Sequence, residues 1–522
     1  MFADGCTGVN RVLAKSLMVV GTSSNVGKSV LCTALCRILA QDGHRVAPFK
    51  SQNMSLNSAV TPSGREIGRA QAVQAAACGI LPSEHMNPVL LKPMSHTLSQ
   101  VILQGRVYET KSARAYFAER TGEIWNAVVE SFRELERRYD VLVIEGAGSP
   151  VEMNLKARDI ANMRTAELAD AAVLLVADID RGGIFASVVG TMHLLTEQER
   201  SRVKGIVVNK FRGDPSLFED GVRMLEAYTG VPVLGVLPYL REIGIEEEDS
   251  VALEEGRYRL PQLPQDAREC VKVAILELPH LSNFTDFDPL FLEPGVHAYF
   301  CRQPADVADA HVVILPGSKN TVDDLLWLRA NGFEGVIRQR RAAGAFIVGI
   351  CGGYQMLGEE IRDPEGQESK IGRVVGLCEL PIVTTLAREK TTVLTRGQAA
   401  GMFATIPLSG YEIHMGQTVS VKAHQPFARV RTGADGVWRD DGAFSADSSV
   451  MGTYLHGIFD NDAFRRAWLS AVRLRFELRA PEDSFVAMTD HRSKAIDRLA
   501  ATVREHLDMQ SLYQLLLREE DE

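Results

Sequence analysis

Short apolar runs alternate with helical patterns through the first half of the chain. The run at 16–20 precedes a glycine-rich turn, and apolar positions at 29–40 then recur with helical spacing. The later runs are short, β-branched and almost wholly apolar, at 141–146, 171–178, 203–209 and 231–237. Strands that are apolar on both faces are typical of a parallel sheet covered by helices. The pattern therefore predicts an α/β domain built from right-handed crossover units.

The alternation stops at about 240–270 and then begins again. This stretch is charged and carries Pro261 and Pro264, which favour a linker near its end. New strand-like runs follow at 271–278, 310–317 and 346–350, and an amphipathic helical pattern occupies about 493–518. We therefore predict a first domain at 1–255, a linker at 256–270, a second α/β domain at 271–480 and a helical segment, docked on the rest, at 481–522.

Composition and charge narrow the class of protein. The chain has 522 residues, 45% of them hydrophobic and 24% charged, with a net charge of −10. An acidic balance argues against a broad nucleic-acid-binding surface. Eight cysteines without metal-ligand spacing favour a reducing compartment. Because no apolar run reaches the roughly 18 residues of a membrane span, we expect a cytoplasmic protein without one.

The turn "GTSSNVGKS" at 21–29 has the composition of a phosphate-binding loop between a strand and a helix. Such a loop directs backbone N–H groups and a helix N-terminus at phosphate oxygens. Five residues separate Gly21 from Gly27, where the strict motif has four, and Thr22 takes the strict position. We expect ATP to bind Gly21, Thr22, Asn25, Gly27, Lys28 and Ser29, with the Ser29 hydroxyl also ligating Mg²⁺.

Polar residues follow other predicted strands at what should be the same edge of the sheet. Glu145 ends one strand, and Asp178 and Asp180 follow another, so Glu145 and Asp178 are candidate Mg²⁺ ligands beside Ser29. Asn209 follows a further strand and could bind the adenine edge through its amide. A solvated turn is the alternative for each of these residues.

The segment "PFKSQNMSLNS" at 48–58 is polar and poor in helix formers. Lys50, Gln52 and Asn53 gather hydrogen-bonding groups there, beside the expected γ-phosphate. We take them as candidate substrate-binding residues, although this segment alone equally favours an ordinary loop.

Cys351 lies between glycines in "GICGGYQMLG", directly after an apolar run. Gly-x-Cys-x-Gly between a strand and a helix matches the tight turn that presents a nucleophile, with the backbone N–H of Gly352 facing the developing oxyanion. A buried structural cysteine is the alternative. A cysteine nucleophile needs a base, and the residues themselves leave both His414, close to Glu412, and His456 open.

The whole chain resembles the cobyric acid synthase family, glutamine-dependent amidotransferases of cobalamin biosynthesis. The resemblance rests on motifs in order: "GTSSNVGKS", "FKSQNMSLNS", "MNPVLLKP", "IEGAGSP", "DIDRGG", "NKFRGD", "LPGSKNT", "GICGGYQMLG", "GYEIHMG" and "GTYLHGIFDN". The N-terminal half is also similar to dethiobiotin synthetase, which has the same wide glycine spacing. The C-terminal half is similar to class I glutamine amidotransferase domains.

The resemblance assigns roles in the C-terminal half. It implies that Cys351 is the nucleophile and His456 the base, and we expect the backbone of Gly317 to join that of Gly352 in binding the oxyanion. Class I domains usually follow this histidine with proline and glutamate, the third member of the triad. Here Gly457 and Ile458 follow it, so the resemblance implies a Cys–His dyad and leaves the group that orients His456 unassigned.

The resemblance also implies a reaction. Carboxylates of a corrinoid, adenosylcobyrinic acid a,c-diamide, would be activated by ATP and amidated at positions b, d, e and g with ammonia from glutamine, giving cobyric acid. The alternatives are cobyrinic acid a,c-diamide synthase and a P-loop regulatory protein with an inert glutaminase-like domain.

Overall fold

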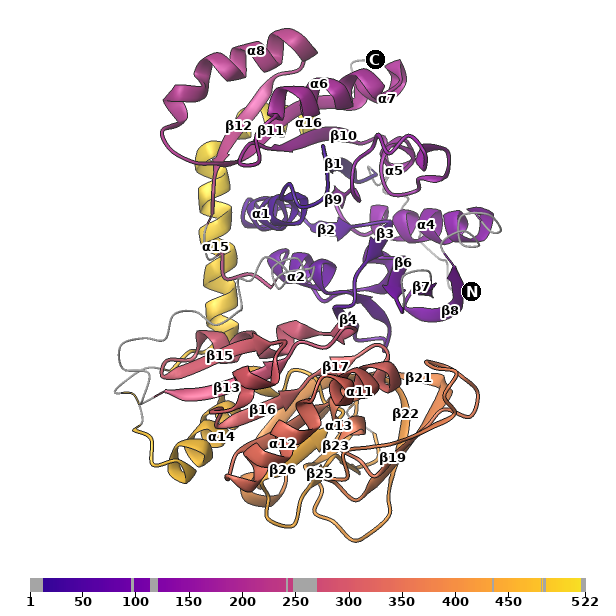
Figure 1. The fold of residues 1–522 in the computed structure, drawn as a ribbon. Coiled ribbons are helices and arrows are strands. Elements are labelled where there is room, and N and C mark those ends of the chain that lie inside the picture. Colours follow the sequence, from indigo (N-terminus) through magenta and orange to yellow (C-terminus); the bar gives the residue numbers. More distant parts are fainter. Residues whose placement is uncertain are drawn as a thin grey trace, which may run out of the picture.

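The computed structural model describes residues 13–94, 98–112, 121–240, 243–246, 270–433, 436–479, 481 and 485–517. Two α/β units lie one above the other in Figure 1, and helix α15 (Met488–His506) runs beside both. Except for residue 270, the predicted linker at 256–270 lies outside the described residues.

The N-terminal unit contains a six-stranded, all-parallel sheet, as the buried apolar runs predict. Its strand order is β12-β11-β10-β1-β9-β2. The strands are β1 (Lys15–Gly21), β2 (Val46–Phe49), β9 (Val141–Glu145), β10 (Ala172–Asp178), β11 (Val203–Phe211) and β12 (Val233–Pro238). Because β1 lies between β9 and β10, the turn after β1 opens at the centre of the sheet's carboxyl edge, directly before α1 (Lys28–Gln41).

A smaller sheet and a hairpin project from this unit toward the C-terminal unit (Figure 1). The sheet has the order β3-β6-β7-β8 (Gln52–Met54, Val89–Pro93, Leu98–Leu103 and Arg106–Ser112). The hairpin pairs β4 (Ser58–Val60) with β5 (Glu66–Gly68) and leads into helix α2 (Arg69–Ala77). The polar segment at 48–58 thus contains the end of β2, the whole of β3 and the first residue of β4, with turns between them. Ser58 N donates to Asn283 Oδ1 across the boundary between the units, at 2.9 Å.

The C-terminal unit has a second six-stranded sheet of order β15-β13-β16-β18-β26-β25. The first five strands are parallel, namely β15 (Val296–Cys301), β13 (Val271–Leu276), β16 (Val312–Leu315), β18 (Phe346–Ile350) and β26 (Val450–Thr453), and β25 (Ala443–Phe444) is antiparallel to β26. A long hairpin, β21 (Ile382–Ala399) and β22 (Pro407–Ser420), belongs to a separate sheet and was not predicted.

The helices after the second unit return to the first. Arg37 of α1 pairs with Asp497 of α15 at 2.8 Å, and Leu499 and Val503 of α15 join the core around α1. The tail pattern predicts one helical stretch, but the structure has two helices, α15 and α16 (Met509–Leu517). They are separated because Asp508 N donates to Leu234 O of β12, at 2.7 Å.

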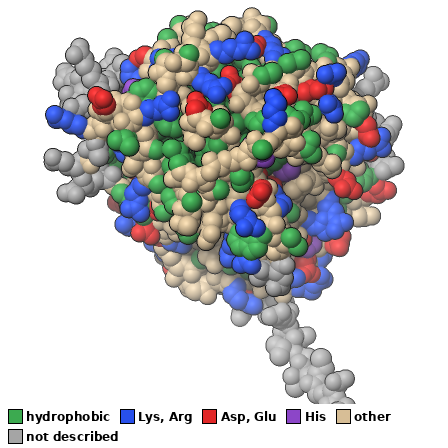
Figure 2. All heavy atoms as spheres, turned by 90° about the horizontal axis from the view of Figure 1, so that it is seen from below, with side chains coloured by type: hydrophobic (Ala, Val, Ile, Leu, Met, Phe, Trp, Pro, Cys, Tyr) green, Lys and Arg blue, Asp and Glu red, His purple; other side chains and the backbone are tan. Residues whose placement is uncertain are grey.

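On the face seen from below in Figure 2, basic and acidic side chains are interspersed with apolar ones. Within the described ranges, none of the helices combines the length and apolar character needed to cross a bilayer.

Candidate active site

The turn after β1 packs so tightly at Gly27 that only glycine fits there. Gly27 has φ 102°, in the left-handed region, and caps α1. A Cβ added there would lie 2.1 Å from Asn209 Nδ2. Asn209 Nδ2 itself donates to Val26 O at 2.7 Å and so supports the loop. Its proposed contact with adenine remains a prediction.

Lys28 and Ser29 lie beside the buried carboxylate of Glu145. Ser29 Oγ donates to Glu145 Oε1 at 2.8 Å, and Lys28 Nζ donates to the carbonyls of Ser23 and Gly148, both at 3.0 Å. A hydroxyl next to a carboxylate is a donor set that suits Mg²⁺. Ser29 and Glu145 are therefore the residues that fit the expected metal ion.

Glu145 stays ionised although it is buried. Its Oε1 also accepts from Lys50 Nζ at 2.8 Å, and its Oε2 accepts from Gln74 Nε2 of α2 at 2.6 Å. Burial raises the pKa of Glu145, but the charge of Lys50 and these hydrogen bonds outweigh it and hold the pKa below its ordinary value. The charged form is thus the one the site stabilises.

The other predicted residues of this edge have different partners. Asp178 accepts from Lys210 Nζ and from Asp180 N, both at 2.8 Å. Asn53 is buried and donates to Gln71 Oε1 at 3.1 Å. Gln52 begins β3 and is half-buried. The metal role of Asp178 and the substrate roles of Lys50, Gln52 and Asn53 stay predictions.

Cys351 occupies a strained turn between β18 and helix α13 (Gly352–Met356). Its φ of 52° and ψ of −106° are rare for a residue with a Cβ. The glycines around it allow close packing, because a Cβ on Gly353 would lie 1.9 Å from Leu315 O and one on Gly349 would lie 2.6 Å from Leu357 Cδ1. The backbone geometry is that of a turn that presents a nucleophile.

His456 follows β26 and is oriented by an aspartate that the sequence analysis missed. His456 Nδ1 lies 2.6 Å from Asp286 Oδ2, and Gly457 N donates to Asp286 Oδ1 at 3.2 Å. Both side chains are buried. Asp286 belongs to the 3₁₀ turn Phe284–Phe287 and therefore fills the position of a third member of the triad. The only signal in the sequence is an acidic residue between two phenylalanines in "NFTDFD".

The charges around His456 favour its protonated form. Burial lowers the pKa of His456, but Asp286 and then Cys351 raise it, to about 10. Among the described residues, His456 Nε2 has no hydrogen-bond partner, and Cys351 Sγ donates to Ile413 O at 3.5 Å. With Nδ1 held by Asp286, Nε2 is the ring atom that can exchange a proton with the sulfur or a leaving group.

The alternative histidine, His414, belongs to a separate network. Its Nε2 lies 3.3 Å from Glu412 Oε2 and its Nδ1 lies 2.9 Å from Gly416 O. Its ring stacks on Tyr454, with the centroids 3.7 Å apart. The geometry thus favours His456 over His414 as the partner of Cys351.

The predicted oxyanion residues lie close to this pair. A Cβ on Gly352 would lie 2.8 Å from Ser318 N, and one on Gly317 would lie 3.4 Å from His456 Cε1. The short strand β17 (Gly317–Ser318) therefore borders the turn at Cys351. Binding of an oxyanion by the backbone of Gly317 and Gly352 stays a prediction.

Comparisons with known proteins agree with this two-unit arrangement. Residues 17–251 match the CobQ/CobB/MinD/ParA nucleotide binding domain, and residues 272–464 match the CobB/CobQ-like glutamine amidotransferase domain. A protein of Citrobacter koseri named cobyric acid synthase is 47% identical over 97% of this chain and 99% of its own. One of Moorella thermoacetica with the same name is 48% identical over 95% and 96%. The chain therefore belongs to the cobyric acid synthase family of glutamine-dependent ligases.

Proposed function

We propose that the protein amidates corrinoid carboxylates in cobalamin biosynthesis, using ATP and the side-chain nitrogen of glutamine. The observation that carries the proposal is that one chain brings together two groups of residues. The first, here called the relay, is the buried set Cys351, His456 and Asp286, in which Asp286 contacts His456 and Cys351 lies close enough to raise the pKa of His456. The second is a phosphate loop whose Ser29 contacts Glu145. The first arrangement suits release of ammonia, and the second suits activation of a carboxylate.

In the glutaminase half-reaction, the sulfur of Cys351 attacks the amide carbon of the glutamine side chain. His456 then gives its proton to the leaving nitrogen, so that ammonia departs and a thioester remains. Asp286 holds His456 so that Nε2 faces the reacting atoms. Water cleaves the thioester and releases glutamate, and the backbone N–H groups of Gly352 and Gly317 stabilise the oxyanion of each step.

In the synthetase half-reaction, a substrate carboxylate attacks the γ-phosphorus of ATP and gives an acyl phosphate and ADP. Ammonia then displaces phosphate and forms the amide. Lys28 and the loop N–H groups bind the phosphate oxygens as charge shifts among them. A magnesium ion held by Ser29 and Glu145 would neutralise further phosphate charge. Activation is required because a carboxylate is a poor electrophile.

We propose adenosylcobyrinic acid a,c-diamide as the substrate, amidated at the b, d, e and g carboxylates to give cobyric acid. The support is the name shared by relatives that match nearly the full length of the chain. One phosphate loop would then serve four carboxylates, so the corrinoid has to change its position between steps.

Replacing Cys351 by Ala separates the two half-reactions. Without the nucleophile, glutamine-supported amidation should fall by about 10³-fold or more, whereas synthesis with added ammonium should persist because the phosphate loop is intact. Amide formation with each nitrogen source measures both. Normal use of glutamine by this variant would refute the nucleophile assignment.

Replacing Asp286 by Asn tests the third member of the relay. Loss of a triad carboxylate costs about 10⁴-fold in a well-studied protease, and we expect kcat with glutamine to fall by about 10³-fold or more. The proposed step needs protonated His456, and this form is lost as the pH rises through the pKa of His456. Asp286 raises that pKa, so its loss should lower the pKa. The alkaline limit of kcat/KM for glutamine should therefore move to lower pH. An unchanged pH profile would exclude this role.

Replacing Lys28 by Ala should abolish synthesis with both glutamine and ammonium, because the acyl phosphate precedes either nitrogen source. Glu145→Gln should show a similar loss together with a higher magnesium requirement. Product formation at several magnesium concentrations measures both effects. Ammonium-dependent synthesis at the normal rate in the Lys28 variant would contradict the role of the loop.

The four amidations should release partly amidated corrinoids during turnover. With substrate in excess, mass spectrometry of early samples should show products with one, two and three new amides before the product with four. Direct appearance of cobyric acid alone would contradict release between steps. Amidation of cobyrinic acid at only the a and c positions would assign the protein to the a,c-diamide synthases instead.

A further inference from the structure

Arg69, the first residue of α2, crosses from the N-terminal unit to the back of the glutaminase relay. Its guanidinium Nη2 donates to the hydroxyl of Tyr411 on β22, and its Cζ lies 5.2 Å from the centre of the Tyr411 ring. The Arg69 side chain is only 15% exposed, and its Nε lies 3.5 Å from Glu246 Oε2. A largely buried arginine from one unit therefore ends on a tyrosine of the other.

Tyr411 touches two members of the relay at once. Its hydroxyl donates to Asp286 Oδ1 at 3.3 Å. Its ring stacks on the imidazole of His456, with the centroids 5.1 Å apart and the planes 12° from parallel. His456 N also donates to Tyr411 O at 2.9 Å. Movement of Tyr411 would therefore displace both Asp286 and His456.

The direction of the hydrogen bonds along this chain is fixed. The guanidinium of Arg69 can only donate, so the Tyr411 oxygen accepts from it and turns its proton toward Asp286. Burial raises the pKa of Tyr411 well above its ordinary value, which keeps the hydroxyl protonated. Asp286 then accepts from Tyr411, from Gly457 N and from His456 Nδ1. Arg69 thus determines which way the hydroxyl that supports Asp286 points.

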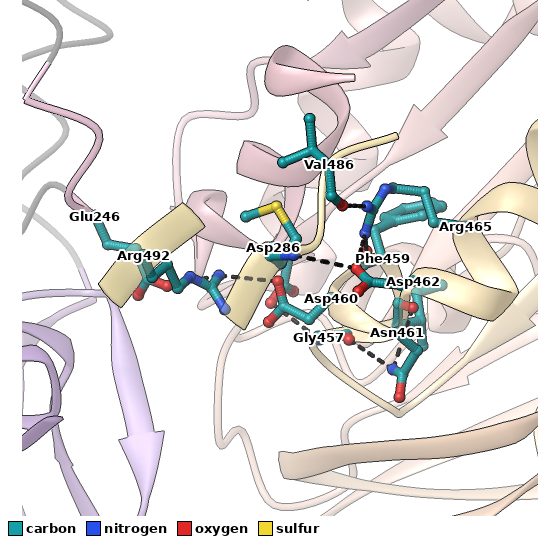
Figure 3. Close-up of polar contacts among 12 residues, drawn as sticks. Glu246, Asp286, Gly457, Phe459, Asp460, Asn461, Asp462, Arg465, Val486 and Arg492 are labelled. Atoms are coloured by element: carbon teal, nitrogen blue, oxygen red, sulfur yellow. Dashed lines mark hydrogen bonds and ion pairs between the residues drawn. The ribbon is translucent and has the colours of Figure 1, made fainter. Parts of the chain in front are cut away.

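Charged side chains lie next to Arg69. Glu246 pairs with Arg69. It also pairs with Arg492 of α15 at 2.6 Å, and Arg492 pairs with Asp460 at 2.8 Å (Figure 3). Asp460 lies three residues after Gly457, so Arg492 and Asp460 border the relay. Among the described residues, neither of these two side chains hydrogen-bonds to the hydroxyl of Tyr411. Arg492 is therefore a matched control for Arg69.

We propose that Arg69 of the synthetase unit is a positioning residue for glutamine hydrolysis, acting through Tyr411 on Asp286 and His456. The inference rests on the proposed function of the relay. Because Arg69 and the relay lie on different units, the glutaminase is complete only when the two units are docked. Ammonia is then produced only where the synthetase can use it.

The test compares Arg69→Met, Arg69→Lys and Arg492→Met in the full chain. We expect Arg69→Met to lower kcat for glutamine by about 10- to 100-fold, since small misplacement of catalytic groups has effects of this size. KM for glutamine should change less than about threefold, and ammonium-supported synthesis should be unchanged. Arg69→Lys should recover part of the loss, and Arg492→Met should stay within about threefold of the parent.

A double-mutant cycle tests the route through Tyr411. If Arg69 acts through the hydroxyl, the variant carrying both Arg69→Met and Tyr411→Phe should be no slower than the slower single variant. The proposal would be overturned if the effects of Arg69→Met and Tyr411→Phe on kcat multiply in the double variant. It would also be overturned if Arg492→Met lowers kcat for glutamine as much as Arg69→Met does, or if Arg69→Met lowers ammonium-supported synthesis in parallel. If Arg69→Met uses glutamine normally while Cys351→Ala does not, this inference alone is refuted. If Cys351→Ala uses glutamine normally, the proposed function is refuted.

Discussion

Two buried carboxylates, Glu145 and Asp286, impose the main constraint on this structure. A buried charge costs several kcal/mol unless partners compensate for it. Glu145 has Lys50, Ser29 and Gln74, and Asp286 has His456, Gly457 N and Tyr411. These partners come from segments far apart in the chain, so the packing that satisfies the carboxylates also assembles the two sites.

Helix α2 takes part in both arrangements. Its Gln74 donates to Glu145 at the phosphate loop, and its Arg69 donates to Tyr411 behind the relay. Gln74 lies five positions after Arg69, which places the two residues about 7.5 Å apart along a helix axis. One short rigid element therefore contacts the supporting groups of both reactions.

Local patterns predicted the strand–turn–helix form of the two loops at Gly27 and Cys351, but not the residues that support them. The phosphate loop and the turn at Cys351 each depend on neighbouring glycines and flanking apolar runs, and such features are visible in a short window of sequence. Asp286 lies 170 residues before His456, so a search for the third triad member beside the histidine could not find it. Lys50 shows a related limit, because its polarity in the sequence did not reveal the ion pair that it makes with Glu145. Its predicted substrate contact stays a prediction.

In the sheets too, features visible in a short stretch of sequence were predicted and features set by tertiary packing were not. Strands buried on both faces were predicted because they are continuously apolar, whereas the hairpin β21–β22 has half-buried and exposed residues along much of its length and escaped notice. The break between α15 and α16 depends on a hydrogen bond to Leu234, a tertiary contact that helical periodicity does not record.

The packing of α15 and α16 on the first unit has a consequence for synthesis on the ribosome. Leu499, Val503 and Leu512 complete the core around α1, yet they are translated only after the entire second unit. At roughly 5–20 residues per second, the nascent first unit waits on the order of tens of seconds with that apolar face uncovered. Vectorial folding from the N-terminus therefore cannot finish this unit, because the last side chains of its core are made only when the chain is almost complete.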